Sequence, residues 1–212
     1  MIPKLHYISQ GKTRQEHLDN IQQACTSGVE LVKLRLKDVS EKKFLKLAAA
    51  AREITSHFQT RLIINDNYKI AKEVKADGVH LGVPELCNDA RKHLYTWQIM
   101  GGTANTLQDC ETLLDNQVNY ISLGPFRATT TKDNTPPVLG INGYTAITDI
   151  LKTGTPIIGF GGITTEDVTA ILNTGISGIA VSEAITHDFN TIRVFNELLK
   201  ASSTAEQRHT FE

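Results

Sequence analysis

The segment LVKLRLKD, residues 31–38, alternates apolar and charged side chains with a period of two. That period predicts a β-strand that has apolar side chains on one face and Lys33, Arg35 and Lys37 on the other. Cations on a buried strand face are costly unless carboxylates or a ligand anion neutralise them. The segment therefore predicts either a solvated strand face or the wall of an anion-binding site.

Seven further apolar runs follow the same plan, and amphipathic stretches with apolar residues three and four apart lie between them. The runs begin near residues 5, 61, 77, 97, 118, 155 and 177. Alternating strands and helices predict a parallel sheet of the α/β class. Eight units fit a single-domain (β/α)₈ TIM barrel over residues 1–200, and a doubly wound open sheet is the alternative. The polar segment 201–212 has no period, so we expect it to fray.

The composition restricts the function. With 22 basic and 23 acidic residues, the chain has no overall charge to attract nucleic acid or an anionic membrane. The apolar runs are too short to span a bilayer, and the start MIPKLHYISQ lacks the apolar core of a signal peptide. Cys25, Cys87 and Cys110 form no pair motif, which is typical of ordinary thiols in a reducing compartment. We expect a cytoplasmic protein, and a homo-oligomer remains open.

In a barrel, the cations of the 31–38 strand would point into its upper part, where active sites of this fold are built. Acidic side chains follow two other strands: Asp66 comes directly after Asn65, and Glu85 lies in the loop after the run at 77. Mg²⁺ often takes one or two protein carboxylates together with water and phosphate oxygens. These positions predict a magnesium site, and helix capping is the alternative for either acid.

The loop SLGPFRATTTKDNTPPVLG, residues 122–140, is long and irregular. Loops of this length usually serve a function. The hydroxyls of Thr129 and Thr131 and the ammonium of Lys132 suit the binding of a diphosphate, with a merely flexible polar loop as the alternative. Arg127 in the same loop is expected to be solvated.

Two glycine- and serine-containing segments, GFGGITTED at 159–167 and AVSEAI at 180–185, follow the last two strands. Barrels of this type often bind a phosphate there through backbone amides, and Gly162 permits close approach of the backbone. Two anion sites across one barrel mouth suggest a transferase with two substrates. His80 at a strand end is more typical of a packed residue than of a general base, and no nucleophile arrangement is evident.

Seven segments together resemble the thiamine phosphate synthase family in their order and approximate spacing, from Lys4 to about Leu199. They are VKLRLK, LIINDN, ADGVHLG, GGTANT, GPFRATTTK, IIGFGGI and GIAVSEAI. The resemblance implies a transferase on a (β/α)₈ barrel that joins hydroxymethylpyrimidine diphosphate to hydroxyethylthiazole phosphate. It also implies Mg²⁺ as the cofactor, the two small molecules as substrate partners, and no protein nucleophile.

The resemblance assigns roles to individual positions. The side chains that would hold the diphosphate are Arg35, Lys37, Asn65 and Lys132, of which Arg35 and Lys132 would stabilise the departing charge. Asp66 and Glu85 would bind Mg²⁺. The remaining implied substrate contacts are Lys33, Thr103, Thr129, Thr131, Gly162, Ser182 and Glu183.

Some positions depart from the family pattern. Lys33 replaces a glutamine that would hydrogen-bond the pyrimidine, and lysine has no acceptor. Glu85 replaces an aspartate, and Glu183 stands where a serine is usual. These departures favour one alternative, a non-catalytic binder of thiamine-related phosphates. The other alternative, a thiazole tautomerase on the same barrel, would carry a histidine where this chain has Pro125.

Overall fold

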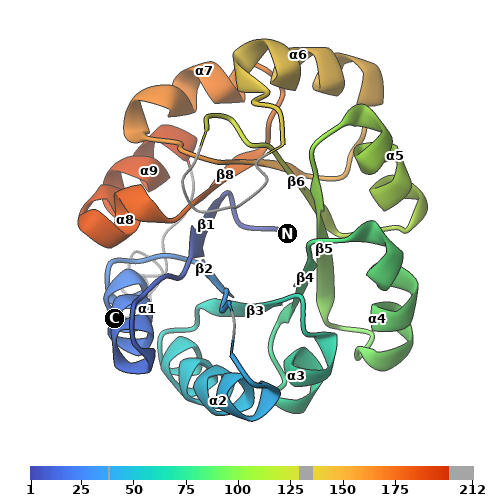
Figure 1. Ribbon diagram of the computed structural model, residues 1–212. Helices are drawn as coiled ribbons and strands as arrows, with labels where there is room; N and C mark the ends of the chain where they lie inside the picture. Colours follow the sequence, from blue (N-terminus) through green and yellow to red (C-terminus); the bar gives the residue numbers. More distant parts are fainter. Residues whose placement is uncertain (38, 129–135, 201–212) are drawn as a thin grey trace.

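The computed structural model describes residues 1–37, 39–128 and 136–200, which form a closed barrel of eight parallel strands in chain order (Figure 1). The strands are β1 (Leu5–Ile8), β2 (Leu31–Leu34), β3 (Arg61–Asn65), β4 (Gly78–Leu81), β5 (Ile99–Ala104), β6 (Tyr120–Leu123), β7 (Ile157–Phe160) and β8 (Gly178–Val181). The predicted (β/α)₈ barrel is confirmed, and the open sheet is excluded because β8 pairs with β1. The predicted polar tail lies outside the described residues.

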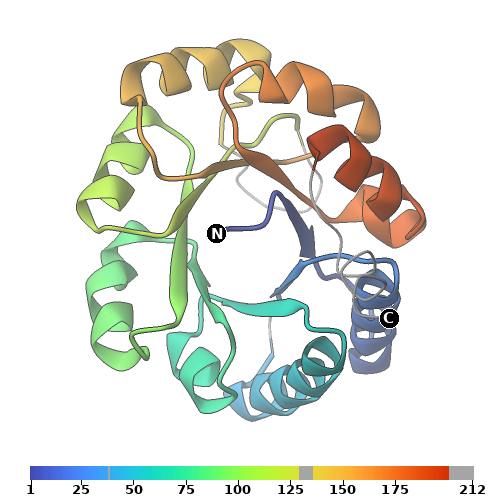
Figure 2. The same ribbon diagram turned by 180° about the vertical axis from the view of Figure 1, so that it is seen from behind.

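Helices surround the barrel on all sides (Figures 1 and 2). They are α1 (Arg14–Thr26), α2 (Glu41–His57), α3 (Tyr68–Glu73), α4 (Cys87–His93), α5 (Leu107–Asp115), α6 (Gly140–Leu151), α7 (Val168–Leu172), α8 (Glu183–His187) and α9 (Thr191–Leu199), with 3₁₀ turns η1 (Pro84–Leu86) and η2 (Thr165–Asp167). None of the helices in the described ranges has the length and apolar character needed to cross a bilayer.

The apolar core has two parts. The larger part lies between the strands and the helices, and it contains all three cysteines as buried free thiols, as predicted. The smaller part lies inside the barrel, where Tyr120, Ile158 and Ala180 pack with the partly buried Ile2. Figures 1 and 2 show the N-terminal segment beside the barrel axis, so the chain start covers one end of this interior. Strand alternation produces both parts, because every second side chain points inward.

The interior has room for Tyr120 because β5 carries a glycine opposite it. Gly101 pairs with Tyr120 across the β5–β6 ladder. A Cβ atom at Gly101 would lie 2.1 Å from the Tyr120 ring, closer than any van der Waals contact allows. The absent side chain at 101 therefore permits the aromatic ring that fills the centre of the barrel.

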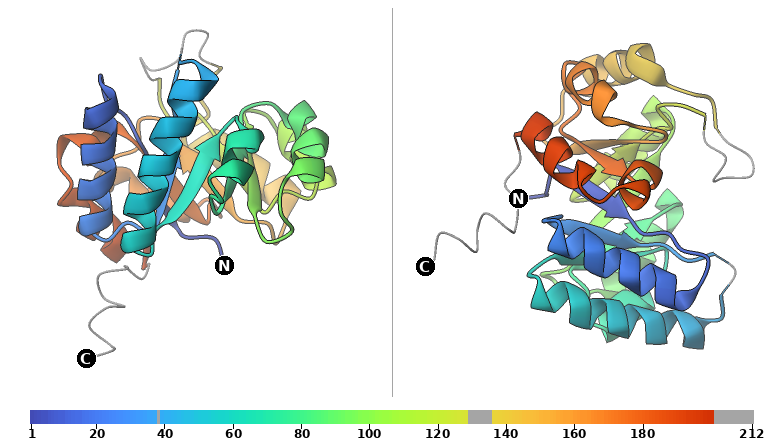
Figure 3. Two further views of the ribbon diagram at one scale, coloured as in Figure 1. Left: turned by 90° about the horizontal axis from the view of Figure 1, so that it is seen from below. Right: turned by 90° about the vertical axis from the view of Figure 1, so that its left-hand side faces the viewer.

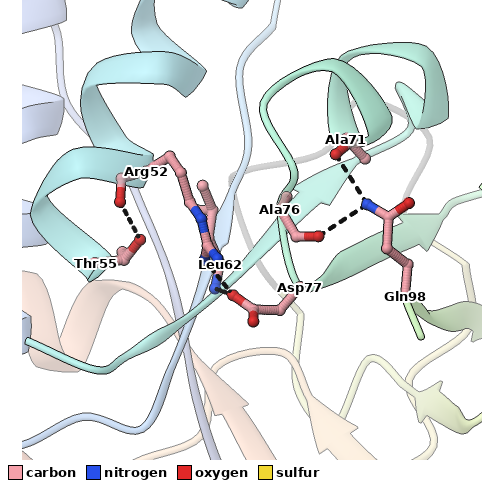
Figure 4. A network of polar contacts seen from close by, with 7 residues as sticks. All are labelled: Arg52, Thr55, Leu62, Ala71, Ala76, Asp77 and Gln98. Carbon is pink, nitrogen blue, oxygen red and sulfur yellow. Dashed lines mark hydrogen bonds and ion pairs between the residues drawn. The ribbon is translucent and has the colours of Figure 1, made fainter. Parts of the chain in front are cut away.

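Polar bridges join α2, β3 and the turns before β4 and β5 (Figure 4). Asp77 accepts hydrogen bonds from Arg52 Nη1 (2.5 Å) and from the backbone N–H of Leu62 (2.8 Å). The Gln98 amide donates to the carbonyls of Ala71 (2.9 Å) and Ala76 (2.8 Å). These bonds satisfy backbone groups at the N-terminal ends of the strands, the end of the barrel that faces away from the predicted site.

The strand expected over 31–37 is shorter than predicted. β2 ends at Leu34, so the alternation of faces applies to Lys33 but not to Arg35 and Lys37, which lie in the following loop. Lys33 is only 2% exposed and points into the barrel, as predicted. The strand ends early because β1 and β3 offer backbone partners only up to Lys33 and Leu34.

Candidate active site

Lys33 is the only lysine or arginine that the described chain buries inside the barrel. Its Nζ lies 3.5 Å from the hydroxyl of Ser122 and 5.7 Å from the centre of the Tyr120 ring. A cation over an aromatic face gains electrostatic stabilisation, more so when it is desolvated. The structure therefore shows how this ammonium is accommodated in an apolar interior.

His80 belongs to the same interior and is packed, as predicted. Its Nδ1 lies 3.0 Å from the Tyr120 hydroxyl and its Nε2 2.9 Å from Thr103 Oγ1. Its ring also stacks on Tyr120 with 5.5 Å between centroids. Both nitrogens are engaged, so His80 fixes the Thr103 hydroxyl at the end of β5. Tyr120, His80 and Thr103 form a hydrogen-bonded series. Thr103 is its most exposed residue, because it is half-buried whereas the other two are buried.

His6 makes an edge contact with the Tyr120 ring, with 5.1 Å between ring centroids. Burial lowers the pKa of His6 to about 3, and the nearby Lys33 charge adds to this effect. The imidazole is therefore neutral at physiological pH and leaves Lys33 as the interior cation. The Tyr120 ring therefore contacts two histidine rings, that of His80 by stacking and that of His6 at an edge.

The predicted acids lie at the ends of adjacent strands. Asp66 follows β3 in a left-handed conformation (φ 61°), and its carboxylate accepts hydrogen bonds from Gly82 N (2.6 Å) and Asn65 Nδ2 (2.5 Å). The bond from Gly82 comes from the chain just after β4, so it joins the two loops. Glu85 lies in η1 and is exposed. Asn65 and Asp66 are brought together as predicted.

The carboxylates have the chemistry that Mg²⁺ needs. Asp66 is oriented by two donors, and each of its oxygens keeps a further lone pair. A second carboxylate, Glu85, is on the neighbouring loop. In residues 1–37, 39–128 and 136–200, no group of three or more His, Cys, Asp or Glu side chains is placed to hold a metal. Two carboxylates plus water and phosphate oxygens remain a fitting donor set for this ion.

Arg35 and Lys37 line a cavity of about 760 Å³ at the C-terminal ends of β1, β2 and β8. Ser182 also lines it, and the Ser182 hydroxyl donates to the carbonyl of Ile8 (2.7 Å). That bond joins the ends of β8 and β1 at the cavity wall. Asn65 is not part of the described lining. The predicted diphosphate ligands in the described chain therefore form two groups, Arg35 and Lys37 at the cavity and Asn65 at the end of β3.

The glycine-rich loop after β7 is held by an ion pair that the sequence did not reveal. Arg127 binds Asp167 through both nitrogens (2.5 and 2.7 Å) and also donates to the Gly162 carbonyl (2.7 Å). Arg127 is exposed, as expected, and a carboxylate in η2 pairs with it in addition. Gly162 has φ 64°, which suits glycine.

Asp167 is held ionised by this arrangement. Burial by itself raises the pKa of Asp167, but hydrogen bonds from Arg127 and from Thr164 outweigh burial and lower the pKa below its usual value. The loop after β7 therefore carries a fixed negative charge that keeps Arg127 in place.

The other residues predicted to bind substrate are exposed or lie outside the described part of the chain. Glu183 is the exposed first residue of α8. Thr129, Thr131 and Lys132 lie outside the described residues. Sequence reasoning also missed four cations in the wall of the Arg35 cavity, Lys12, Arg14, Lys43 and Lys46. The sequence feature that could have revealed them is their position at the starts of two helices, α1 and α2, which are neighbours in the fold (Figure 3).

Known proteins resemble this chain over most of its length. The sequence pattern of the family described as thiamine monophosphate synthase matches residues 5–185. The chain is 41% identical over 95% of its length to thiamine-phosphate synthase of Flavobacterium johnsoniae, and 42% identical over 94% to that of Flavobacterium psychrophilum; each match covers 99% of the relative. Thiamine phosphate pyrophosphorylase from Pyrococcus furiosus has the same fold (TM-score 0.77, 22% identity, 92% of this chain and 96% of that one).

Proposed function

Because the chain belongs to the thiamine monophosphate synthase family, a family of transferases in thiamine biosynthesis, we propose that it forms thiamine phosphate. The substrates are hydroxymethylpyrimidine diphosphate and hydroxyethylthiazole phosphate, and diphosphate is released. The observation that carries this proposal is the joint presence of Arg35, Lys37 and Asp66 at the C-terminal ends of β2 and β3. That end of a barrel is where its active site is built.

The chemistry we propose is a dissociative substitution. The bond between the pyrimidine methylene carbon and the diphosphate oxygen breaks, and its electron pair leaves with the diphosphate. The thiazole nitrogen then forms the new carbon–nitrogen bond with its lone pair. No protein nucleophile takes part, so the side chains act by positioning the two substrates and by stabilising negative charge on the leaving group.

Arg35, Lys37 and Asn65 are the described residues that would contact the diphosphate, together with Lys132. Arginine offers a planar set of donors to phosphate oxygens, and lysine adds a mobile point charge. The two neighbouring groups, one at the Arg35 cavity and one at Asn65, would bind the diphosphate from two sides. The Gly162 backbone and Ser182 would meet the thiazole phosphate, and Thr129 and Thr131 would contact that phosphate and the leaving group.

Asp66 and Glu85 would hold Mg²⁺, which when bound neutralises charge on the diphosphate. Asp66 is suited to this because Gly82 N and Asn65 Nδ2 fix its carboxylate before any ligand arrives. Thr103, fixed by His80, would meet the pyrimidine beside Lys33. We further propose that the reaction takes place in the cytoplasm, where three buried free thiols are stable as thiols.

One observation favours a second candidate, a non-catalytic binder of thiamine-related phosphates. Lys33 points a cation into the interior where the pyrimidine would sit, and a cation opposes the positive charge that develops on the methylene carbon. The contacts with the Tyr120 ring and Ser122 hold this ammonium on the β6 side of the interior.

The test mixes purified protein with both substrates and Mg²⁺ and follows thiamine phosphate and diphosphate together. The proposal predicts that both form in equal amounts and that EDTA abolishes the reaction. Binding of the thiazole phosphate without formation of either product would instead establish the non-catalytic binder.

A further inference from the structure

Arg127 comes from the loop after β6, and it is bonded to the neighbouring loop after β7. Its two terminal nitrogens donate to the two carboxylate oxygens of Asp167 (2.5 and 2.7 Å). The same side chain donates to the Gly162 carbonyl (2.7 Å), and the backbone N–H of Arg127 donates to the Gly161 carbonyl (3.0 Å). The guanidinium also lies 5.0 Å from the centre of the buried Phe126 ring. Together these contacts fix the arginine and, through it, the two glycine carbonyls.

The bonds to the glycine carbonyls set the direction of two consecutive peptide groups. In a trans peptide the N–H points opposite to the C=O, and neither of these two peptide bonds is cis. Because the carbonyls of Gly161 and Gly162 are turned to Arg127, the N–H groups of Gly162 and Ile163 point away from it. Both glycines have positive φ (103° and 64°), a conformation that a residue with a side chain adopts only with strain.

The two N–H groups that point away from Arg127 are available to a ligand. Neither Gly162 N nor Ile163 N donates to an acceptor within the described part of the chain. The next N–H, that of Thr164, is already taken by the Asp167 carboxylate (2.8 Å). On the other side, a Cβ atom at Gly162 would lie 3.0 Å from the Cβ of Arg127, so that side is filled. Consecutive backbone N–H groups around a residue of positive φ form a concave anion site.

The charge of Arg127 itself is already used. Both terminal nitrogens are directed at Asp167, and Asp167 is ionised, so the pair has no net charge. A carboxylate near a phosphate site would by Coulomb's law weaken phosphate binding. Any favourable effect of Asp167 on an anion must therefore come through the backbone that the pair holds in place.

We propose that Arg127 and Asp167 are positioning residues for the phosphate of the thiazole substrate. They hold the peptide groups on both sides of Gly162 so that the N–H groups of Gly162 and Ile163 face that phosphate. The inference rests on the proposed synthase function, because it takes the loop after β7 as the phosphate site. It adds to that function two side chains that contact neither substrate.

The test measures kcat and the KM of each substrate in the wild type, Asp167→Asn and Glu166→Gln. Removal of an acid near a phosphate should by charge alone lower the KM for hydroxyethylthiazole phosphate. The positioning role predicts the opposite for Asp167→Asn: this KM rises about fivefold to tenfold, the equivalent of about one hydrogen bond. The KM for hydroxymethylpyrimidine diphosphate and kcat should each change less than about twofold, as expected for a loss of ground-state binding to one substrate.

Glu166→Gln is the matched control, because it removes the same charge from the exposed neighbouring residue and should leave the KM for the thiazole phosphate unchanged or lower. Arg127→Met is the second variant, which removes the donors but keeps an unbranched side chain, and it should raise the same KM. All assays are run where circular dichroism shows each variant to be folded. Partial unfolding lowers the apparent kcat and does not raise one KM selectively.

Two outcomes would overturn the proposal. One is an unchanged or lower KM for the thiazole phosphate in Asp167→Asn, and the other is an equal rise in the KM of both substrates, which indicates general loosening of the barrel mouth. If the wild type forms no thiamine phosphate, the proposed function fails instead. Calorimetric binding of hydroxyethylthiazole phosphate to the same variants then decides the positioning role, since equal affinity in the wild type and Asp167→Asn contradicts it.

Discussion

At the scale of single residues, the most informative position is Lys33. The sequence predicted its inward direction, because a period-two strand leaves no other choice. The sequence could not predict its surroundings, since Ser122 and Tyr120 come from β6, on the far side of the barrel. The same limit applies to His80, whose partners Tyr120 and Thr103 are distant in the chain.

Replacing Lys33 by glutamine tests what the lysine does. Lys33→Gln adds an acceptor for the pyrimidine amino group and removes a cation from the reacting carbon. We expect kcat to be unchanged or higher, measured from initial rates of thiamine phosphate formation. Lys33→Met is the control, because it removes the charge without adding an acceptor. A large loss of kcat in both variants would show that lysine has its own role in this chain.

Replacing Asp66 by asparagine tests whether this residue binds Mg²⁺. Asp66→Asn keeps the shape and an oxygen for Gly82 N but removes the negative charge. We expect the Mg²⁺ concentration for half-maximal rate to rise about tenfold or more, since charge count sets affinity at such sites. Asp89→Asn, at an exposed acid on α4, is the control. An unchanged Mg²⁺ requirement would contradict the assignment.

At the scale of elements, the β6–α6 and β7–α7 loops are joined more firmly than their sequences suggest. Backbone bonds run from Phe126 N to Phe160 O (2.7 Å) and from Arg127 N to Gly161 O (3.0 Å). The Arg127–Asp167 pair adds a side-chain clamp. Each loop could be recognised from its glycines and threonines, but the pairing required the barrel, which makes β6 and β7 neighbours.

Removing the clamp should destabilise the fold. Asp167→Asn loses charge-assisted bonds to Arg127, so we expect the free energy of unfolding at neutral pH to fall by about 1–3 kcal/mol. Denaturant titration measures the change. Glu166→Gln, at the exposed neighbouring acid, should have little effect. Equal stability of the two variants would show that the clamp contributes nothing.

The clamp also predicts a pH dependence. The pKa of Asp167 is lowered in the folded state, so its contribution is complete above the ordinary carboxyl pKa and is lost as pH falls through the lowered value. The stability difference between the wild type and Asp167→Asn should therefore shrink in acid. A difference that stays constant down to acidic pH would contradict this linkage.

At the scale of the whole molecule, the sequence was sufficient for the architecture. Eight apolar runs separated by helical periods leave few arrangements other than a closed parallel barrel. Strand ends were less predictable, as β2 shows, because backbone pairing with β1 and β3 rather than side-chain pattern decides where a strand stops. The cavity between α1 and α2 was not predicted at all, since it forms only where two loops meet.

Packing inside the barrel depends on the space that Gly101 leaves for the Tyr120 ring. Gly101→Ala places a Cβ against the ring in a packed interior, so we expect a loss of about 1–3 kcal/mol in the free energy of unfolding. Gly154→Ala is the control, because a Cβ there meets no atom within 4 Å. It should be neutral or raise stability by about 0.4–1 kcal/mol. Thermal unfolding distinguishes the two, and a neutral Gly101→Ala would contradict the packing account.

The central claim is that the diphosphate is bound where β2 opens into its loop. The most direct measurement compares kcat/KM for hydroxymethylpyrimidine diphosphate in the wild type, in Arg35→Ala and in Lys92→Ala, an exposed cation on α4. Arg35→Ala should lose about 2–4 kcal/mol of transition-state stabilisation, the size found for donors at a developing charge. Lys92→Ala should match the wild type. Near wild-type kcat/KM in Arg35→Ala would contradict the account.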